Sequence, residues 1–408
     1  MKQLLFPEDV QFWYETLRLF GHTSYGGSEF GEILSTSEKI TVGDYDSWHD
    51  AWLATAERVA AEAARSLEAG HEVSARDGYL RAATYYRSAE FFLHGNPDDP
   101  RVEYAYTRNV ECFHAAAALY TPAIESVEIP YEGTVLRGYF YRAAGEGPKP
   151  TMVMHNGFDG SAEEMHFFGA LAGQERGYHV LTFDGPGQPS AIHREKLPFR
   201  PDWENVVGPV LDFLAGNPAV DPARIALLGI SLGGMLAPRA AAFEPRIAAV
   251  IAVDGVYDAT GSFVSALPFG REELERRARA EHDAEFDAIL AAGREASPVL
   301  RWACDQGRYV MGAASDREFL GKYLDYHLRD GVAERITCPT LVCSAEEDLF
   351  FAGDGENQAE PEALFEHLTC EKTLMTFTVD EGADAHCHVG AQRLAMSRIY
   401  DWLAEVLR

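Results

Sequence analysis

Six short apolar segments after residue 150 constrain the fold of this chain more than any other feature. They cover residues 151–155, 179–183, 224–230, 247–253, 339–344 and 373–379. Each is followed by a turn and then by a stretch with helical periodicity. Strands that are apolar throughout are buried on both faces, and strands that alternate with helices form parallel sheets. This sequence pattern therefore predicts an α/β fold, with a mostly parallel sheet and helices on both of its faces.

The first 125 residues follow a different pattern. Apolar residues from Val10 to Phe20 repeat at helical spacing, a Gly-rich loop is expected around 26–31, and helices are expected over 47–70, 74–95 and 101–120. We predict a helical cap or flanking domain over 1–125 and the α/β core over 126–408. The core should begin with a β-hairpin, because apolar and polar residues alternate on both sides of Glu132-Gly133.

A second helical region is expected within the core. Residues 258–335 interrupt the alternation of strands and helices with charged, helix-favouring sequence. We interpret them as an insertion between two strands that forms a second part of a lid.

The composition excludes several functional classes. With 64 acidic and 35 basic residues, the net charge of −29 argues against nonspecific binding to nucleic acids or anionic membranes, which require a positive field. The N-terminus lacks the pattern of a signal peptide, and no apolar run is long enough to span a bilayer. The six cysteines are scattered, which is typical of reduced thiols in a cytoplasmic protein.

The most informative motif is Gly-Ile-Ser-Leu-Gly-Gly at 229–234, directly after a predicted strand. A G-x-S-x-G sequence at a strand-to-helix turn is typical of a nucleophile elbow, which lifts the serine hydroxyl above the sheet. Ser231 is therefore the predicted nucleophile. An ordinary turn serine is the alternative.

A serine nucleophile needs a base, and an acid that orients the base. In this type of fold the chain order is Ser, acid, His. We predict His386 as the base, with His388 as its competitor, and Asp348 as the acid. The alternatives for the acid are Glu346, Glu347, Asp254 and Asp258. No metal site is predicted, because the segment His386-Cys387-His388 has no further ligand cluster in the sequence.

Two backbone N–H groups are predicted to bind the oxyanion. One belongs to Leu232, after the nucleophile, and the other to Phe158 in the loop His155–Gly160 that follows a strand. Asp159, Asp258 and Tyr85 are the predicted substrate contacts. The aromatic stripe at 79–92, which holds Tyr85, is more typical of a helix core than of a substrate wall.

Taken together, the segments HNGFDGSAEE, FDGPGQ, GISLGG, CSAEEDLFF and EGADAHC resemble one branch of the α/β-hydrolases. That branch contains 2,6-dihydropseudooxynicotine hydrolase and the fungal pigment hydrolases that shorten a heptaketide. The N-terminal segment LRAATYYRSAEFFLHGNPDDPR is similar to its helical flank. The resemblance implies the α/β-hydrolase fold, a Ser231–Asp348–His386 triad between core and helical cap, no cofactor, and often a homodimer. Pro189 departs from the branch, where glycine is common.

These observations lead to one main hypothesis. The chain is a cofactor-independent serine hydrolase that attacks a carbonyl carbon of a small molecule, at a carbon–carbon bond beside a ketone or at an ester. An acyltransferase or cyclase that uses the same acyl-enzyme is one alternative. A non-catalytic binding protein on the same fold is the other.

Overall fold

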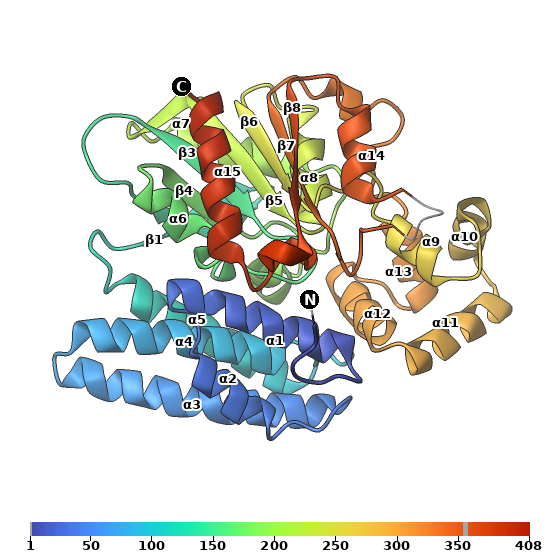
Figure 1. The fold of residues 1–408 in the computed structure, drawn as a ribbon, viewed down its shortest axis with the longest axis horizontal. Helices are drawn as coiled ribbons and strands as arrows, with labels where there is room; N and C mark the ends of the chain where they lie inside the picture. The colour runs from blue at the N-terminus through green and yellow to red at the C-terminus, as the bar shows by residue number, and fades with distance from the viewer. Residues whose placement is uncertain (1, 354–357) are drawn as a thin grey trace.

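The computed structural model describes residues 2–353 and 358–408 and is built around one eight-stranded sheet (Figure 1). The strands lie in the order β1-β2-β4-β3-β5-β6-β7-β8. Their bounds are β1 Glu125–Tyr131, β2 Thr134–Tyr141, β3 Lys149–His155, β4 His179–Phe183, β5 Val220–Ile230, β6 Ala249–Val253, β7 Thr340–Ala345 and β8 Lys372–Phe377. The pairs β1–β2 and β2–β4 are antiparallel, and the other pairs are parallel. The predicted hairpin and mostly parallel sheet are confirmed.

Helices cover both faces of this sheet, as the continuous apolar strands require. Along β3, Met152 and Met154 pack on the face shared with α6 and α15, whereas Val153 packs on the face of α7 and α8. This alternation follows from the two-residue period of a strand. The covering helices are α6 Ala170–Glu175, α7 Glu204–Ala215, α8 Gly233–Ala241, α14 Glu360–His367 and α15 Gln392–Val406.

Five helices precede the sheet and lie together beside it (Figure 1). They are α1 Val10–His22, α2 Phe30–Ser37, α3 Tyr45–Glu68, α4 Glu72–Glu90 and α5 Pro100–Ala117. Asp9, Asp44 and Asp99 cap α1, α3 and α5 by accepting hydrogen bonds from free backbone N–H groups. The expected loop over 26–31 is partly wrong, because α2 begins at Phe30.

These helices share one buried hydrophobic cluster with a face of the sheet, which contains both Trp52 of α3 and Met154 of β3. Because the two regions share this cluster, a domain boundary at residue 125, with residues 1–125 folding on their own, stays a prediction.

The region between β6 and β7 is helical, as the sequence indicates. It holds α9 Gly261–Ala266, α10 Arg271–Ala278, α11 Ala284–Ala296, α12 Pro298–Val310 and α13 Asp316–Tyr323. It extends to one side of the molecule, where α12 contacts α1 (Figure 1). Asp258 anchors its base, because its buried carboxylate pairs with Arg271 at 2.8 Å and with Arg329 at 3.0 Å.

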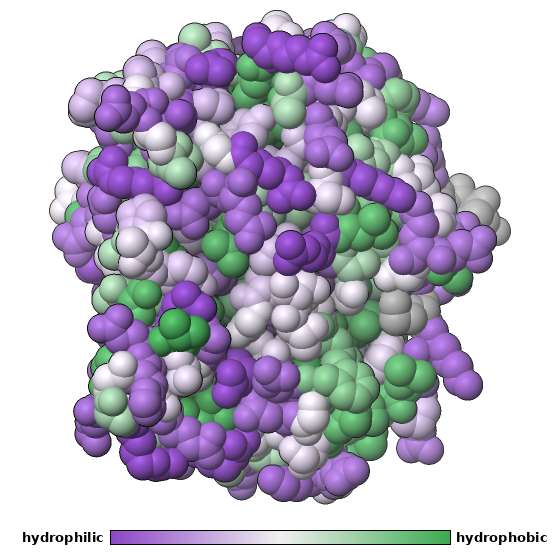
Figure 2. Space-filling model, turned by 60° about the vertical axis from the view of Figure 1, so that its left-hand side comes forward, coloured by the Kyte–Doolittle hydropathy of each residue, from purple (hydrophilic) through white to green (hydrophobic). Residues whose placement is uncertain are grey.

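The described surface is mixed in polarity. Figure 2 shows one face, on which hydrophilic and hydrophobic residues are interspersed. The large hydrophobic side chains that are exposed, such as Leu4 and Phe30, are separated from one another in the sequence. Within the described residues, no helix combines the length and the apolar character needed to cross a bilayer. The six cysteines are free thiols.

A prediction for stability concerns the close approach of β2 and β4. A Cβ atom added at Gly138 would collide with the Thr182 carbonyl oxygen and lie 3.0 Å from Phe183 Cα. Both neighbours are backbone atoms that cannot move aside, so Gly138→Ala should cost about 1–3 kcal/mol. Calorimetry should show a lower melting temperature. Gly31→Ala is the matched control, because Gly31 is an exposed helical residue with open space around its Cα. A melting temperature unchanged by Gly138→Ala would contradict this account.

Candidate active site

Ser231 stands in a strained turn at the carboxyl end of β5. Its φ is 60°, a left-handed conformation that costs a non-glycine residue energy. The turn is held by the Ser231 N–H, which donates to the Val253 carbonyl at 3.1 Å. At Gly229 a Cβ would collide with the Gly233 carbonyl group, so the tight turn requires glycine there. The serine hydroxyl is thereby presented above the edge of the sheet.

The structure brings Ser231, His386 and Asp348 into one line of hydrogen bonds. His386 Nε2 lies 2.8 Å from Ser231 Oγ, and His386 Nδ1 lies 2.8 Å from Asp348 Oδ2. The other oxygen of Asp348 accepts hydrogen bonds from the backbone N–H groups of Phe350 and Phe351. Burial disfavours the charged carboxylate, but His386 and these donors outweigh it and hold the pKa of Asp348 below its usual value.

A second carboxylate also faces His386. Asp254 follows β6, and its Oδ2 lies 3.1 Å from His386 Nδ1 while accepting a hydrogen bond from the Cys387 N–H. Asp254 is fully buried, and this burial raises its pKa to about 7. The imidazole Nδ1–H therefore lies between two carboxylates.

The other sequence candidates for acid and base occupy different places. Glu346 and Glu347 are exposed. His388 is buried against the Phe377 ring, its Nδ1 lies 3.1 Å from the Ala383 carbonyl oxygen, and burial lowers its pKa to about 4. The Asp258 carboxylate forms ion pairs with Arg271 and Arg329 at the base of the insertion.

The loop after β3 packs directly on the Ser231 turn. A Cβ at Gly157 would lie 2.6 Å from the Ile230 carbonyl oxygen and 2.7 Å from the Leu232 nitrogen, so only glycine allows this contact. Gln188 holds the loop from the other side, because its side-chain amide donates to the carbonyl groups of Asn156 and Gly157. Within residues 2–353 and 358–408, the N–H groups of Phe158 and Leu232 donate to no protein acceptor.

A cavity opens above Ser231. Its walls are mainly aromatic and include Tyr14, Phe158, Phe263, Trp302, Phe319, Tyr323 and Phe350. The insertion therefore contributes the roof, as expected, together with α1. Asp159 also lines the cavity, and its carboxylate is held by Arg18 at 2.8 Å and Arg87 at 3.2 Å.

Two predicted substrate contacts need correction. Tyr85 lies outside this cavity, because its ring is buried among the N-terminal helices and its hydroxyl donates to Glu32 at 2.8 Å. The aromatic stripe at 79–92 is helix core, although Phe91 supports the cavity from behind by stacking on Trp302. Asp258 also lies outside the cavity lining.

Comparison with known proteins places the chain in a family. Residues 10–262 match the family model described as esterase FrsA-like, and residues 152–393 match the alpha/beta hydrolase family. The chain belongs to the α/β-hydrolase family. Among its relatives are hydrolase LUC6 of a Fusarium species, 34% identical over 98% of this chain and 97% of the relative. Another is 20-hydroxy-prefusarin hydrolase FUS2 of Gibberella moniliformis, 35% identical over 96% and 95%.

The α/β-hydrolase likeness extends to solved structures. The crystal structure of 2,6-dihydroxy-pseudo-oxynicotine hydrolase matches with a TM-score of 0.72 and 25% identity, covering 95% of each chain. Since that coverage includes the N-terminal helices and the insertion, both belong to a shared architecture.

Sequence reasoning missed two residues around the site of this α/β-hydrolase. Tyr14 and Trp302 line the cavity, but their sequence pattern is that of core positions in amphipathic helices. Asp254, an alternative acid in the sequence, contacts His386 alongside Asp348. The sequence indicated Asp254 by its place directly after a buried strand, where polar residues of parallel sheets converge.

A prediction about charge follows from the two carboxylates. Burial alone would lower the pKa of His386, but Asp348 and Asp254 outweigh it and raise this pKa to about 9. Histidine-selective nitrogen NMR should therefore show His386 losing its proton well above the ordinary pH of about 6.5. Asp254→Asn removes one stabilising charge and should lower this pKa by roughly one unit or more. Asp401→Asn, on the exposed side of α15, is the control. An unchanged or higher pKa in Asp254→Asn would refute the role of this contact.

Proposed function

We propose that this α/β-hydrolase is a cofactor-independent serine hydrolase with Ser231 as nucleophile, His386 as base and Asp348 as the orienting acid. The observation that carries the proposal is the pair of 2.8 Å hydrogen bonds joining the three side chains at the floor of the cavity. Nucleophile, base and orienting group within hydrogen-bond reach are the requirement for acyl transfer through a serine.

The proposed reaction begins when Ser231 Oγ attacks a substrate carbonyl carbon and the neutral form of His386, which is favoured above its pKa of about 9, accepts the hydroxyl proton at Nε2. The N–H groups of Phe158 and Leu232 then stabilise the oxyanion of the tetrahedral intermediate. The positive charge that forms on His386 is balanced by Asp348. When the intermediate collapses, His386 returns the proton to the leaving group, and water later releases the acyl group by the same route.

The leaving group can be a carbon or an oxygen. In a β-dicarbonyl substrate the departing carbanion is stabilised as an enolate, and His386 can protonate its carbon. In an ester the departing group is an alkoxide. The aromatic walls favour a mid-sized aromatic or polyketide-like carbonyl compound, since flat rings pack well against Phe and Trp side chains. Relatives named as hydrolases of 20-hydroxy-prefusarin and 2,6-dihydroxy-pseudo-oxynicotine support a small organic substrate. A homodimer and a cytoplasmic location stay predictions.

The proposed roles predict the effect of removing each group. Ser231→Ala and His386→Ala should each lower kcat by about 10³-fold or more, because such residues act as a unit. Asp348→Asn should also be severe, since it misdirects the imidazole tautomer. A fluorophosphonate should label the wild type but not Ser231→Ala. Near-normal turnover by a folded Ser231→Ala would exclude the nucleophile and, with it, the proposed function.

Product analysis separates the two leaving groups. Incubation with aryl esters and with 1,3-diketones, followed by mass spectrometry, identifies which bond is cleaved. Cleavage of the diketones identifies a carbon–carbon hydrolase, and cleavage of the esters alone identifies an esterase.

The cavity roof predicts selectivity for substrate size. Trp302→Ala removes an aromatic wall, so kcat/KM for a naphthyl ester should fall by about 10–100-fold while a small alkyl ester is much less affected. Phe30→Ala provides the control, because Phe30 is 61% exposed and lies outside the cavity lining. Equal losses for the two esters in Trp302→Ala would mean that this wall does not select the substrate.

A further inference from the structure

A second cavity lies beside the aromatic one, and several charged and polar side chains line it together with apolar ones. It forms where the end of α4, the turn at 191–195 and α12 meet. Its lining includes Arg87, Glu90, His94, Asp159, His193 and Gln306. Asp159 lines both cavities. The proposed hydrolase chemistry uses none of Glu90, His94 and His193.

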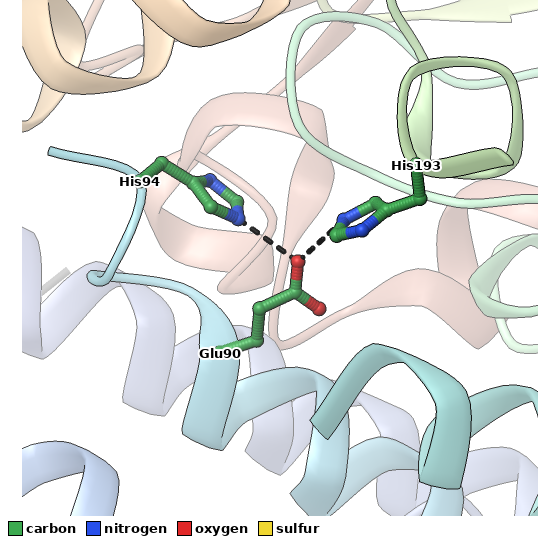
Figure 3. A group of neighbouring side chains, drawn as sticks. All are labelled: Glu90, His94 and His193. Carbon is green, nitrogen blue, oxygen red and sulfur yellow. Dashed lines mark hydrogen bonds and ion pairs between the residues drawn. The ribbon is translucent and has the colours of Figure 1, made fainter. Parts of the chain in front are cut away.

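These three side chains point toward one another (Figure 3). Glu90 Oε1 lies 2.9 Å from His94 Nε2 and 2.8 Å from His193 Nε2. The side chains of Glu90, His94 and His193 are only 9%, 12% and 4% exposed. They come from two segments far apart in sequence, since Glu90 ends α4 and His193 lies about 100 residues later. His193 belongs to a single π-helical turn, Ala191–Glu195, and such turns are found often at functional sites.

Gln306 determines which nitrogen of His94 carries a hydrogen. Its Nε2 donates to the Phe158 carbonyl oxygen at 2.8 Å, so its Oε1 must be the atom that faces His94 Nδ1 at 2.5 Å. His94 Nδ1 therefore carries a hydrogen, and in neutral imidazole the other nitrogen then has a lone pair. That lone pair faces a carboxylate oxygen. A positive charge must lie between them, as a proton on Nε2 or as a metal ion.

We propose that Glu90, His94 and His193 bind a divalent transition-metal ion of the Zn²⁺ type. Two imidazole nitrogens and one carboxylate oxygen, all mostly buried, are a ligand set that zinc and its neighbours favour. His94 also has the outer partner typical of a metal ligand, a carbonyl oxygen that accepts its other N–H. The cation would sit near the C-terminal end of α4, which the helix dipole makes favourable for positive charge.

Two of the three ligand separations need only small changes to admit the ion, and the three ligand atoms already lie within 4.8 Å of one another. Zinc binds nitrogen and oxygen at about 2.0–2.2 Å, which separates tetrahedral ligand atoms by roughly 3.3 Å. The present separations of 2.8 and 2.9 Å would have to open by about half an ångström. The adjoining cavity leaves space for a water or another small ligand to complete the coordination.

The ion would connect three parts of the molecule. Glu90 and His94 belong to the N-terminal helical region, His193 follows β4, and Gln306 on α12 reaches the carbonyl group of Phe158. A metal here would stabilise the position of the loop proposed to bind the oxyanion.

The proposal is tested by metal binding to the full, tag-free chain after treatment with a chelator. Competition with a coloured chelator should show one tightly bound Zn²⁺ per chain. His94→Gln and His193→Gln should each weaken binding by about 100-fold or more, and Gln306→Met by about 10–100-fold. His71→Gln, at an exposed histidine, should bind as the wild type does. Zn²⁺ should raise the melting temperature only of proteins that bind it.

The visible absorption spectrum of Co²⁺ bound to the wild-type protein provides a measurement that does not depend on whether any variant folds. The proposed ligands predict ligand-field bands without thiolate charge transfer, whereas binding at the group Asp254, His386 and Cys387 would add a sulfur band. Absence of stoichiometric Zn²⁺ binding, binding unaffected by His94→Gln and His193→Gln, or a sulfur band would overturn the proposal. Loss of fluorophosphonate labelling in Ser231→Ala is independent of these results, so the two proposals fail separately.

Discussion

Three strained turns at one edge of the sheet hold the candidate active site together. Ser231, Asp254 and Cys387 have φ values of 60°, 56° and 56°, a conformation that disfavours side chains by about 1–3 kcal/mol each. Hydrogen bonds couple these turns, because Ser231 N–H donates to the strand before Asp254, and Cys387 N–H donates to the Asp254 carboxylate. The sheet positions the first two turns, because Ser231 and Asp254 directly follow the neighbouring strands β5 and β6, and the hydrogen bond to Asp254 positions the turn at Cys387.

The loop after β3, which we propose binds the oxyanion, depends on contacts from several directions. Gln188 binds its carbonyl groups from the core, and Gln306 binds the Phe158 carbonyl from the insertion. Asp159, the next residue, is held by Arg18 and Arg87 of the N-terminal helices. Because all three parts of the chain position one short loop, the helical regions do more than cover the cavity. Their packing also determines where the Phe158 N–H lies.

Buried charge is concentrated at the junction between the N-terminal helices and the sheet. Arg18 pairs with both Asp159 and Glu164, and Arg87 pairs with Glu15 and Asp159. Breaking a buried pair leaves an uncompensated charge, so such a network penalises any misdocked arrangement of the helices more than an apolar interface would. We infer that it specifies how the helices meet the sheet.

Local pattern alone determined the strands, the hairpin and the Ser231 turn, because apolar runs and glycine spacing act within a few residues. It also indicated Asp348 and His386, since the chain order of an α/β sheet places them after known strands. Tertiary structure decided the rest. Tyr85 and Trp302 look alike as aromatic helix residues, but only packing makes one core and the other cavity wall. The pairing of Asp254 with His386, and of His193 with Glu90, joins side chains more than 100 residues apart in sequence. Local pattern can nominate such residues, as it did Asp254, but only the folded chain shows which of them meet.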